Sequence, residues 1–378
     1  MIRKYCRKRL ALLPLLLFLS STVAWSQSVN PRPLTSQELV RLVYQLPAHP
    51  EKRDEIAEVI RTRGLGFPLT AGLQSLVATK SGNDALLRRT LEEAERRRVN
   101  PIAAALPPEA EGLELLEKTR AATLAAAAIM PDFLVKQQIT RSQALGNTNN
   151  WNIYDRLSIA VSYRANGGEQ YKLLAVNGMQ PAVDTSEGSD YSGKLGGTTS
   201  TGEYVSILSE LFRPERQAKF RLIDTDLLRK RPTLVYEFEV KQENSAQRIQ
   251  TSGATDASVI TGYRGRIWVD RENYRVLRLE DISAEIPRDF PVTAASSVID
   301  YDWVSINEQP HLLPSRAIIQ LTAREGPRIR QTRNDILFKG YRKFGSELKI
   351  IDIDDKDFAP EEPEKTPPPD KPAKSDKP

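Results

Sequence analysis

The sequence predicts an α+β protein, in which a small helical module precedes a large antiparallel β-sheet that is covered by helices. Two observations predict this fold. Apolar residues recur at helical spacing between residues 34 and 98, and after Pro131 they alternate with polar residues as in strands with one buried face. With 378 residues, 40% apolar and 27% charged, the chain is long enough for two domains and has a globular composition.

Residues 1–26 have the features of an export signal. Five of the 54 Lys and Arg residues lie among the first nine, an apolar run follows from Leu10 to Leu19, and Ala24-Trp25-Ser26 resembles a cleavage site. The apolar run is about half of the ~20 residues that a spanning helix needs, although an uncleaved anchor is the alternative. We therefore predict a cleaved signal peptide, a periplasmic or secreted protein, and no transmembrane span after cleavage.

The net charge of +5 and the only cysteine, Cys6, both belong to this signal. The remaining chain is neutral and has no thiol, which excludes disulfides and thiol catalysis. Neutrality also argues against a nucleic-acid partner. We therefore interpret the clusters of basic residues at 96–98, 229–231 and 328–330 as surface groups that keep the protein soluble or that contact anionic lipid head groups.

Residues 34–98 are predicted to form a module of four short helices. Thr35 and Glu38 match a capping box at the start of the first helix, and Gly64 ends the second. Residues 99–130 follow as a linker and an alanine-rich helix that begins at Glu109. None of the four short helices is long enough to be stable alone, so we expect them to share one core.

Residues 131–353 are predicted to form the sheet, with a helical insertion at 201–212. The clearest strand is 232–241, in which Tyr236 and Phe238 share one face while Glu237 and Glu239 lie on the wet face. The other predicted strands are 157–163, 169–177, 218–225, 258–270, 273–284, 294–305, 313–323 and 329–339. Their connections are too short for crossover helices, which indicates antiparallel pairing. Residues 354–378 are rich in Pro and charge and are predicted to be a disordered tail.

No motif in the sequence predicts catalysis, a metal site or a cofactor. Gly188 to Lys194 fit the start of a phosphate loop, but Leu195 stands where a Ser or Thr must follow. His49 and His311 have no second histidine at ligand spacing. We therefore predict that the protein is not an enzyme.

A sheet with one apolar face must be covered by helices, close on itself or leave a cavity for a ligand. Seven apolar side chains from the insertion and the strands are candidates for lining such a cavity. They are Leu208, Leu211, Phe212, Tyr236, Phe238, Trp268 and Trp303. For the tryptophans, ordinary core packing is the alternative.

Several stretches within residues 128–353 resemble a group of uncharacterised secreted proteins common in acidobacteria and related soil bacteria. They include 130–133, 202–204, 262–270 and 341–344. The pattern of 267–270 followed by 276–279 is also similar to that of periplasmic lipoprotein-carrier and sigma-regulator domains. This resemblance implies a curved antiparallel half-barrel in the cell envelope, with helices that close its concave face over an apolar cavity.

The leading hypothesis is a non-enzymatic envelope protein that binds an acyl chain, a lipoprotein or a hydrophobic peptide in this half-barrel. The alternative is a periplasmic scaffold that binds envelope proteins through the helical module and the Pro-rich tail. A hydrolase with an unrecognised site is the third hypothesis.

Overall fold

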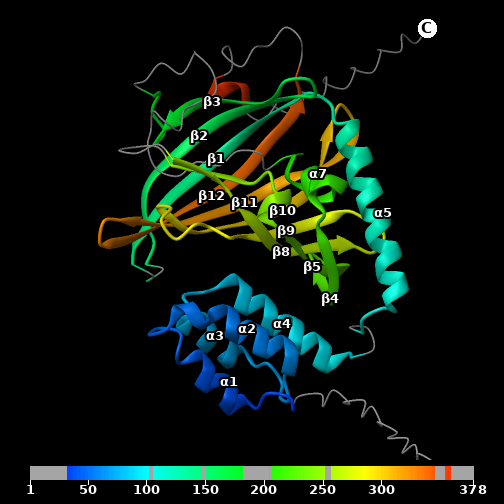
Figure 1. Cartoon of the computed structure of the whole chain (residues 1–378), viewed down its shortest axis with the longest axis vertical. Helices are drawn as coiled ribbons and strands as arrows, with labels where there is room; N and C mark the ends of the chain where they lie inside the picture. The colour runs from blue at the N-terminus through cyan, green and yellow to red at the C-terminus, as the bar shows by residue number, and fades with distance from the viewer. Residues whose placement is uncertain are drawn as a thin grey trace, which may run out of the picture.

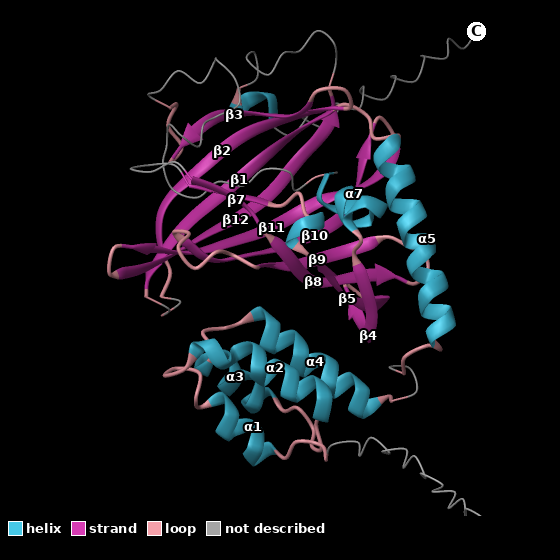
Figure 2. Cartoon of the chain, viewed as in Figure 1, coloured by secondary structure: helices cyan, strands magenta, loops and turns pink. Residues whose placement is uncertain are grey.

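The structure is a computed structural model that describes residues 32–101, 105–146, 148, 150–181, 204, 206–251, 257–344 and 354–358. It is an α+β fold with an open, strongly curved antiparallel sheet, as the sequence predicts. Figures 1 and 2 show a group of helices beside the sheet and a long helix along the strand ends. The predicted signal peptide and almost all of the predicted tail lie outside the described residues.

The helices beside the sheet are α1 (Ser36–Val43), α2 (Arg53–Arg63), α3 (Ala71–Lys80) and α4 (Ala85–Val99). We call them, with the segments that join them, the helical module. Thr35 and Glu38 form the predicted capping box, in which each side chain accepts a hydrogen bond from the other residue's backbone N–H. The four helices bury a core of their own, which includes Leu39, Ile60 and Leu87. The division of the chain into domains at these boundaries stays a prediction.

Ten strands form the main sheet, in the order β3-β2-β1-β12-β11-β10-β9-β8-β5-β4. Their bounds are β1 (Phe133–Leu145), β2 (Asn152–Arg164), β3 (Gly168–Val176), β4 (Lys219–Leu228), β5 (Arg231–Val240), β8 (Gly262–Asp270), β9 (Val276–Ala284), β10 (Val292–Ile306), β11 (Gln309–Glu325) and β12 (Arg328–Lys343). Strands β6 (Arg248–Thr251) and β7 (Ala257–Ile260) form a separate two-stranded sheet. All neighbouring strands are antiparallel.

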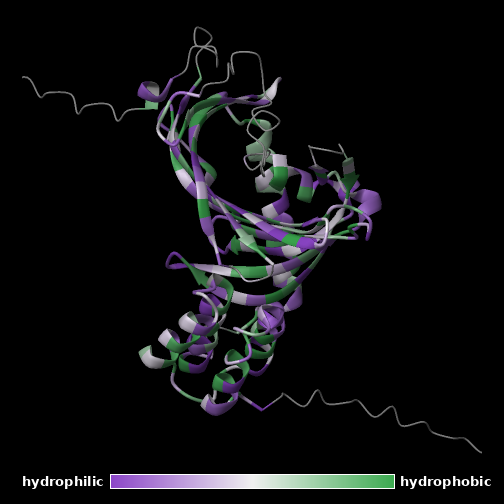
Figure 3. Cartoon of the chain, turned by 90° about the vertical axis from the view of Figure 1, so that its left-hand side faces the viewer, coloured by the Kyte–Doolittle hydropathy of each residue, from purple (hydrophilic) through white to green (hydrophobic). Residues whose placement is uncertain are grey.

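Two helices lie on the inner side of the curve. Helix α5 (Glu109–Ala128) runs along the strand ends, and the seven-residue helix α7 (Ser206–Phe212) lies over the strands. Figure 3 shows the curvature of the sheet, with the helical module outside the curve. The sheet thus has a concave face covered by α5 and α7 and a convex face that meets the helical module.

Several elements differ from the expectations, and one of them is β6, for which no strand is predicted. Strand β1 was not among the predicted strands, because Gln137 and Arg141 occupy positions where an apolar residue would mark the buried face. The predicted strand 258–270 is divided into β7 and β8 at Thr261, and β7 leaves the main sheet to pair with β6. Of the predicted helix 201–212, the structure describes helix only from Ser206, and residues 201–203 and 205 lie outside the described residues.

Candidate functional site

A single row of apolar cross-strand neighbours crosses the concave face from one edge of the sheet to the other. From β4 to β3 it consists of Leu222, Tyr236, Ile267, Leu279, Ile299, Ala317, Ile336, Ile139, Leu157 and Val176. We call it the apolar row. Its members belong to the main core or pack against it. The apolar row is thus a continuous apolar line across the concave face of all ten strands, although positions two residues away on a strand, such as Gln137 and Arg141 on β1, are polar.

Helix α5 approaches the apolar row closely because it carries a glycine at the contact. A Cβ atom on Gly112 would lie 2.8 Å from Cδ2 of Leu222, too close for any side chain without movement of that leucine. The hydroxyl of Tyr236 donates a hydrogen bond of 2.7 Å to the carbonyl oxygen of Gly112. Burial raises the pKa of Tyr236 to about 12. Tyr236 therefore joins the row to its cover through one polar atom.

Helix α7 covers the same face with apolar side chains. Leu208, Leu211 and Phe212 are buried in the main core. Phe212 stacks on Phe220 of β4 with ring centroids 5.5 Å apart, and Phe220 lies 6.2 Å from Phe238 of β5. This aromatic series fixes α7 over the β4–β5 edge of the sheet.

The structure brings five of the seven cavity candidates together under or within these covers. They are Leu208, Leu211, Phe212, Tyr236 and Phe238. The other two lie elsewhere. The indole N–H of Trp268 donates 2.7 Å to Asp226 and its register neighbour is Val235, which places Trp268 on the convex face. Trp303 is 41% exposed at the rim of the sheet, near α5.

Trp303 is exposed because the buried side of β10 changes along the strand. Ile299 and Tyr301 are buried, but beyond them Val304 and Ile306 pack on the core instead of Trp303. The pairing of β10 with β11 is irregular between Asp300 and Tyr301, where the alternation begins to change. The alternation that Trp303 shares with Ile299 and Tyr301 in the sequence therefore does not predict its burial.

Polar groups that the sequence analysis did not single out interrupt the concave face near β1. Arg141, only 2% exposed, donates from Nε to Asp155 at 2.7 Å. Gln137 donates from its amide to the hydroxyl of Tyr204 at 3.0 Å. On β9, the buried carboxyl of Asp281 accepts from Gln247 at 3.2 Å, and burial raises its pKa to about 6. The charge of Arg141 is matched by a carboxylate, whereas Gln137 and Asp281 have neutral hydrogen-bond partners.

The convex face meets α4 through charged groups. Arg96 donates to Asp226 at 3.0 Å and to the carbonyl of Thr225 at 3.2 Å. Arg97 donates to Glu93 at 2.5 Å and also to Asp224 of β4. This contact corrects the interpretation of residues 96–98: only Arg98, which pairs with Glu95 of its own helix, is left to the surface. The acids of β4 that face Arg96 and Arg97 are about 130 residues away in sequence, so no local pattern reveals them.

Two further contacts extend this interface along α4 and α2. Arg89 pairs with Glu280 of β9, and its guanidinium lies over the ring of Trp268 at 5.5 Å. Glu58 of α2 accepts from Arg266 of β8 at 3.4 Å. We call the contacts of these residues with those of Glu93, Arg96 and Arg97 the charged interface.

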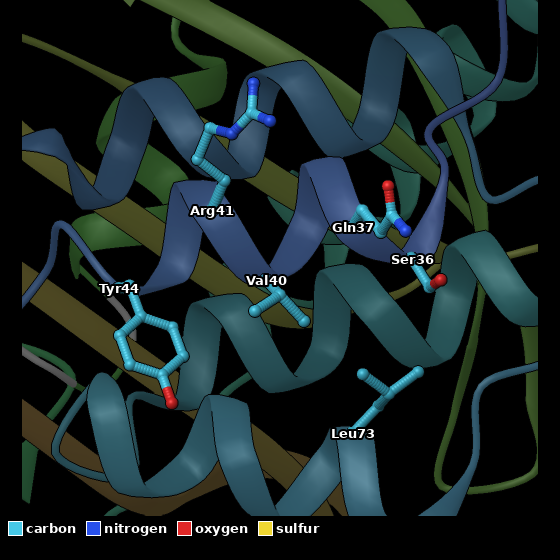
Figure 4. Close-up of a pocket in the computed structure, with 6 residues that line it drawn as sticks. All are labelled: Ser36, Gln37, Val40, Arg41, Tyr44 and Leu73. Atoms are coloured by element: carbon cyan, nitrogen blue, oxygen red, sulfur yellow. The ribbon is translucent and has the colours of Figure 1, made fainter.

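Two hollows in the described part of the structure lie on the helical module. One of about 460 Å³ is open to the surface between α1 and α3, and Figure 4 shows Val40, Tyr44 and Leu73 around it. Its other lining residues are Ser36, Gln37 and Arg41. A second of about 260 Å³ lies between α3 and α4. None of the seven cavity candidates lines either hollow.

Within the described residues, no group of three or more His, Cys, Asp and Glu side chains is placed to hold a metal ion. His49 contacts Glu51 at 3.1 Å in a turn of the helical module. Burial and the charge of Arg275 lower the pKa of His311. A membrane-spanning helix would need a longer apolar stretch than any helix in the described part of the chain offers.

Comparisons with known proteins return solved structures only. No family model and no curated protein matches the chain. A LolA superfamily protein from Nitrosomonas europaea is 15% identical, with a TM-score of 0.25, over 66% of this chain and 97% of that one. A putative outer membrane lipoprotein-sorting protein domain from Vibrio parahaemolyticus is 14% identical, with a TM-score of 0.31, over 65% and 95%.

A DUF1329 family protein from Desulfovibrio piger is 10% identical, with a TM-score of 0.26, over 62% of this chain and 95% of that chain. At these TM-scores the likeness carries no conclusion about this chain, and the function must be argued from its own residues. The resemblance to secreted acidobacterial proteins stays a prediction.

Proposed function

We propose that the protein is an exported, non-enzymatic carrier that binds an acyl chain on the concave face of its sheet, in the periplasm. The apolar row is the observation that carries this proposal. A continuous apolar line across ten strands offers a long surface for a chain of methylene groups, each worth about 0.8 kcal/mol when it is buried.

The covers of this face support the proposal because they are separable elements. Helix α7 has seven residues and is too short to be stable away from the sheet. Helix α5 contacts the sheet through Gly112 and also packs Leu115 and Leu116 into the main core, so α7 is the cover that a ligand displaces more easily. A ligand that displaces α7 would exchange one apolar contact for another at small cost.

The test is to purify the exported protein gently and to identify co-purifying lipid by mass spectrometry, followed by titration with a fluorescent fatty acid. We expect bound acyl chains and saturable binding of the probe. Leu211→Ala on α7 should strengthen probe binding several-fold, because it loosens the helix that the ligand displaces from the face. Tyr44→Ala in the hollow of the helical module is the matched control and should leave it unchanged. Absence of both co-purifying lipid and probe binding would show that the proposal is wrong.

A second candidate function is capture of an envelope protein by the helical module. The hollow between α1 and α3 favours it, because Tyr44 is 55% exposed beside Val40 and Leu73. Tyr44→Ala would then abolish partner binding while Leu211→Ala would not, which is the opposite of the result expected for an acyl-chain carrier.

A further inference from the structure

Arg275 is a partly buried arginine beside the sheet that lacks the carboxylate partner of its neighbour Arg278. It lies in the turn before β9, where its Nη1 donates 3.2 Å to the carbonyl oxygen of Ala122 on α5. Among the described residues, no carboxylate lies within ion-pair distance of its guanidinium. Burial lowers its pKa, and no acid opposes that effect. A charge that has been partly removed from water without a partner costs free energy, which an incoming anion would recover.

The contrast with Arg278 on the same strand shows what is missing. Arg278 makes two hydrogen bonds to Asp300, of 2.6 and 2.8 Å, so its planar guanidinium is matched by a carboxylate. Asp302 directly precedes Trp303, whose ring lies beside Arg275, but its carboxylate faces Arg229 at 3.9 Å. Arg275 therefore retains N–H donors with the geometry that a carboxylate or phosphate requires.

The surroundings of Arg275 combine positive charge with an exposed aromatic ring. The guanidinium lies 5.7 Å from the ring centroid of Trp303, the partly exposed tryptophan at the rim of the sheet. Its charge also reaches His311 on β11. Lys118 of α5 lies 5.1 Å from the ring of Tyr274, the residue before Arg275, and pairs with Glu114 of its own helix. This rim, at the seam between α5 and strands β9 to β11, offers a cation beside an apolar surface.

We propose that Arg275 binds the oxyanion head group of the acyl-chain ligand, while Trp303 contacts the first methylene groups of its chain. The ligand is then an anionic amphiphile, such as a fatty acid or a lipid with a phosphate head group. This inference rests on the proposed function, because it assigns one end of the ligand that the concave face is proposed to hold.

The experiment compares three probes at concentrations below micelle formation. They are a brominated fatty acid, its neutral methyl ester and inorganic phosphate without a chain. Binding is measured by quenching of tryptophan fluorescence, since bromine quenches only nearby rings, and by calorimetry. We expect the acid to bind at least about ten-fold more tightly than the ester and far more tightly than phosphate. Trp303→Phe should remove most of the quenching, whereas Trp151→Phe should not.

Arg275→Gln should lower the affinity for the acid to that for the ester and leave the affinity for the ester unchanged. Arg221→Gln, at an exposed arginine of β4, is the control and should preserve the preference. If Arg275→Gln does not fold, Arg275→Lys and the comparison of acid with ester on the unaltered protein still decide the question.

Each result separates the two proposals. Equal affinity for acid and ester would overturn the role of Arg275 and leave the acyl-chain carrier standing. Binding of phosphate as tight as that of the acid would show an oxyanion site without a chain and overturn the amphiphile. No binding of acid or ester would overturn the proposed function, and this inference with it.

Discussion

The two faces of the curved sheet are built from alternate residues of the same strands, yet they hold their neighbours by different forces. The apolar row on the concave face contains no charged residue. The adjacent row on the convex face begins at β4 with Asp224, Val235, Trp268, Arg278, Asp300 and Arg316. Neighbouring residues of the same strand thus make hydrophobic contacts with α5 and α7 on one face and charged contacts with the helical module on the other.

Because of this difference, the contacts on the two faces should respond to different conditions. Burial of apolar side chains is insensitive to salt and pH, whereas ion pairs depend on both. The concave cover should therefore respond to apolar ligands, and the convex cover should respond to ionic conditions. Four predictions follow this comparison, from the concave face outward.

The largest effect is expected for Phe238→Ala on the concave face. Phe238 is buried between Phe220 and Tyr263, whose ring centroids lie 6.2 and 5.9 Å away. Its loss should lower the free energy of unfolding of the sheet by about 3–5 kcal/mol, because a cavity is left behind. The next residue on the exposed face, Glu239, is the control: Glu239→Ala should change stability by less than about 0.5 kcal/mol in the same chemical denaturation. Equal effects of the two substitutions would contradict the assignment of the faces.

The next effect concerns the charged interface. Arg97→Ala removes the guanidinium that contacts both the carboxyl group of Glu93 and the carboxylate of Asp224. We expect a loss of about 2–3 kcal/mol, below that of a fully buried pair because Arg97 is partly exposed. Hydrogen exchange should show faster exchange in α4 and β4 but not in β1 and β2, which lie on the other side of the sheet. Arg98→Ala, one residue further along α4, should have little effect, and a similar loss there would contradict the assignment.

Short-range patterns in the sequence predicted the features that depend only on neighbouring residues. The capping box at Thr35 and Glu38 needs only three residues of spacing, and the alternation at 232–241 identified β5 and the buried side of Tyr236 and Phe238. The same reasoning failed at β1, because Gln137 and Arg141 stand on the buried face. Their partners, Tyr204 and Asp155, make this burial tolerable, and no periodicity indicates that they will meet.

The candidate site was predicted only in part for a related reason. Alternation cannot say which face of β8 is apolar when both faces are buried, as they are from Ile267 to Asp270. Trp268 therefore looked suitable for a cavity but lies under Arg89 of α4. Arg275 gave no signal, because what marks it is the lack of a carboxylate in space, and sequence shows no distances.

A smaller effect is expected from pH at Glu93. Burial, a hydrogen bond with Asp224 and the negative charge of Asp224 raise the pKa of Glu93 to about 9. The positive charge of Arg97 opposes this rise, and the charge of Asp226 adds a little to it. Arg61 of α2 also faces Glu93. The folded state therefore holds a proton that the unfolded chain, with a pKa near 4.5, releases. This stabilisation is complete below pH 4.5 and is lost as pH rises towards 9.

Because one proton is involved, the slope is at most about 1.4 kcal/mol per pH unit. Glu93→Gln, which resembles the protonated acid, should remove this slope in denaturation measured between pH 6 and 9. Glu95→Gln is the control, since the hydrogen bond from Arg98 lowers the pKa of Glu95 and its effect falls at acid pH. An unchanged slope in Glu93→Gln would mean that Glu93 does not hold the proton.

The smallest effect is expected where the convex face is not covered. Arg221 and Glu237 are cross-strand neighbours joined by a hydrogen bond of 2.6 Å, but their side chains are 73% and 43% exposed. Glu280 of β9 lies on the same convex face, three strands from Arg221. Its partner, Arg89, belongs to the helical module, and the side chains of Glu280 and Arg89 are only 16% and 20% exposed. A double-mutant cycle on Arg221 and Glu237 should give about 0.2–1 kcal/mol and approach zero at 1 M salt. The same cycle on Arg89 and Glu280 should give a larger coupling that persists in salt, because the helical module excludes water from the second pair. Equal couplings would mean that the module does not shield the convex face, and the contrast between the two covers would then rest on the concave face alone.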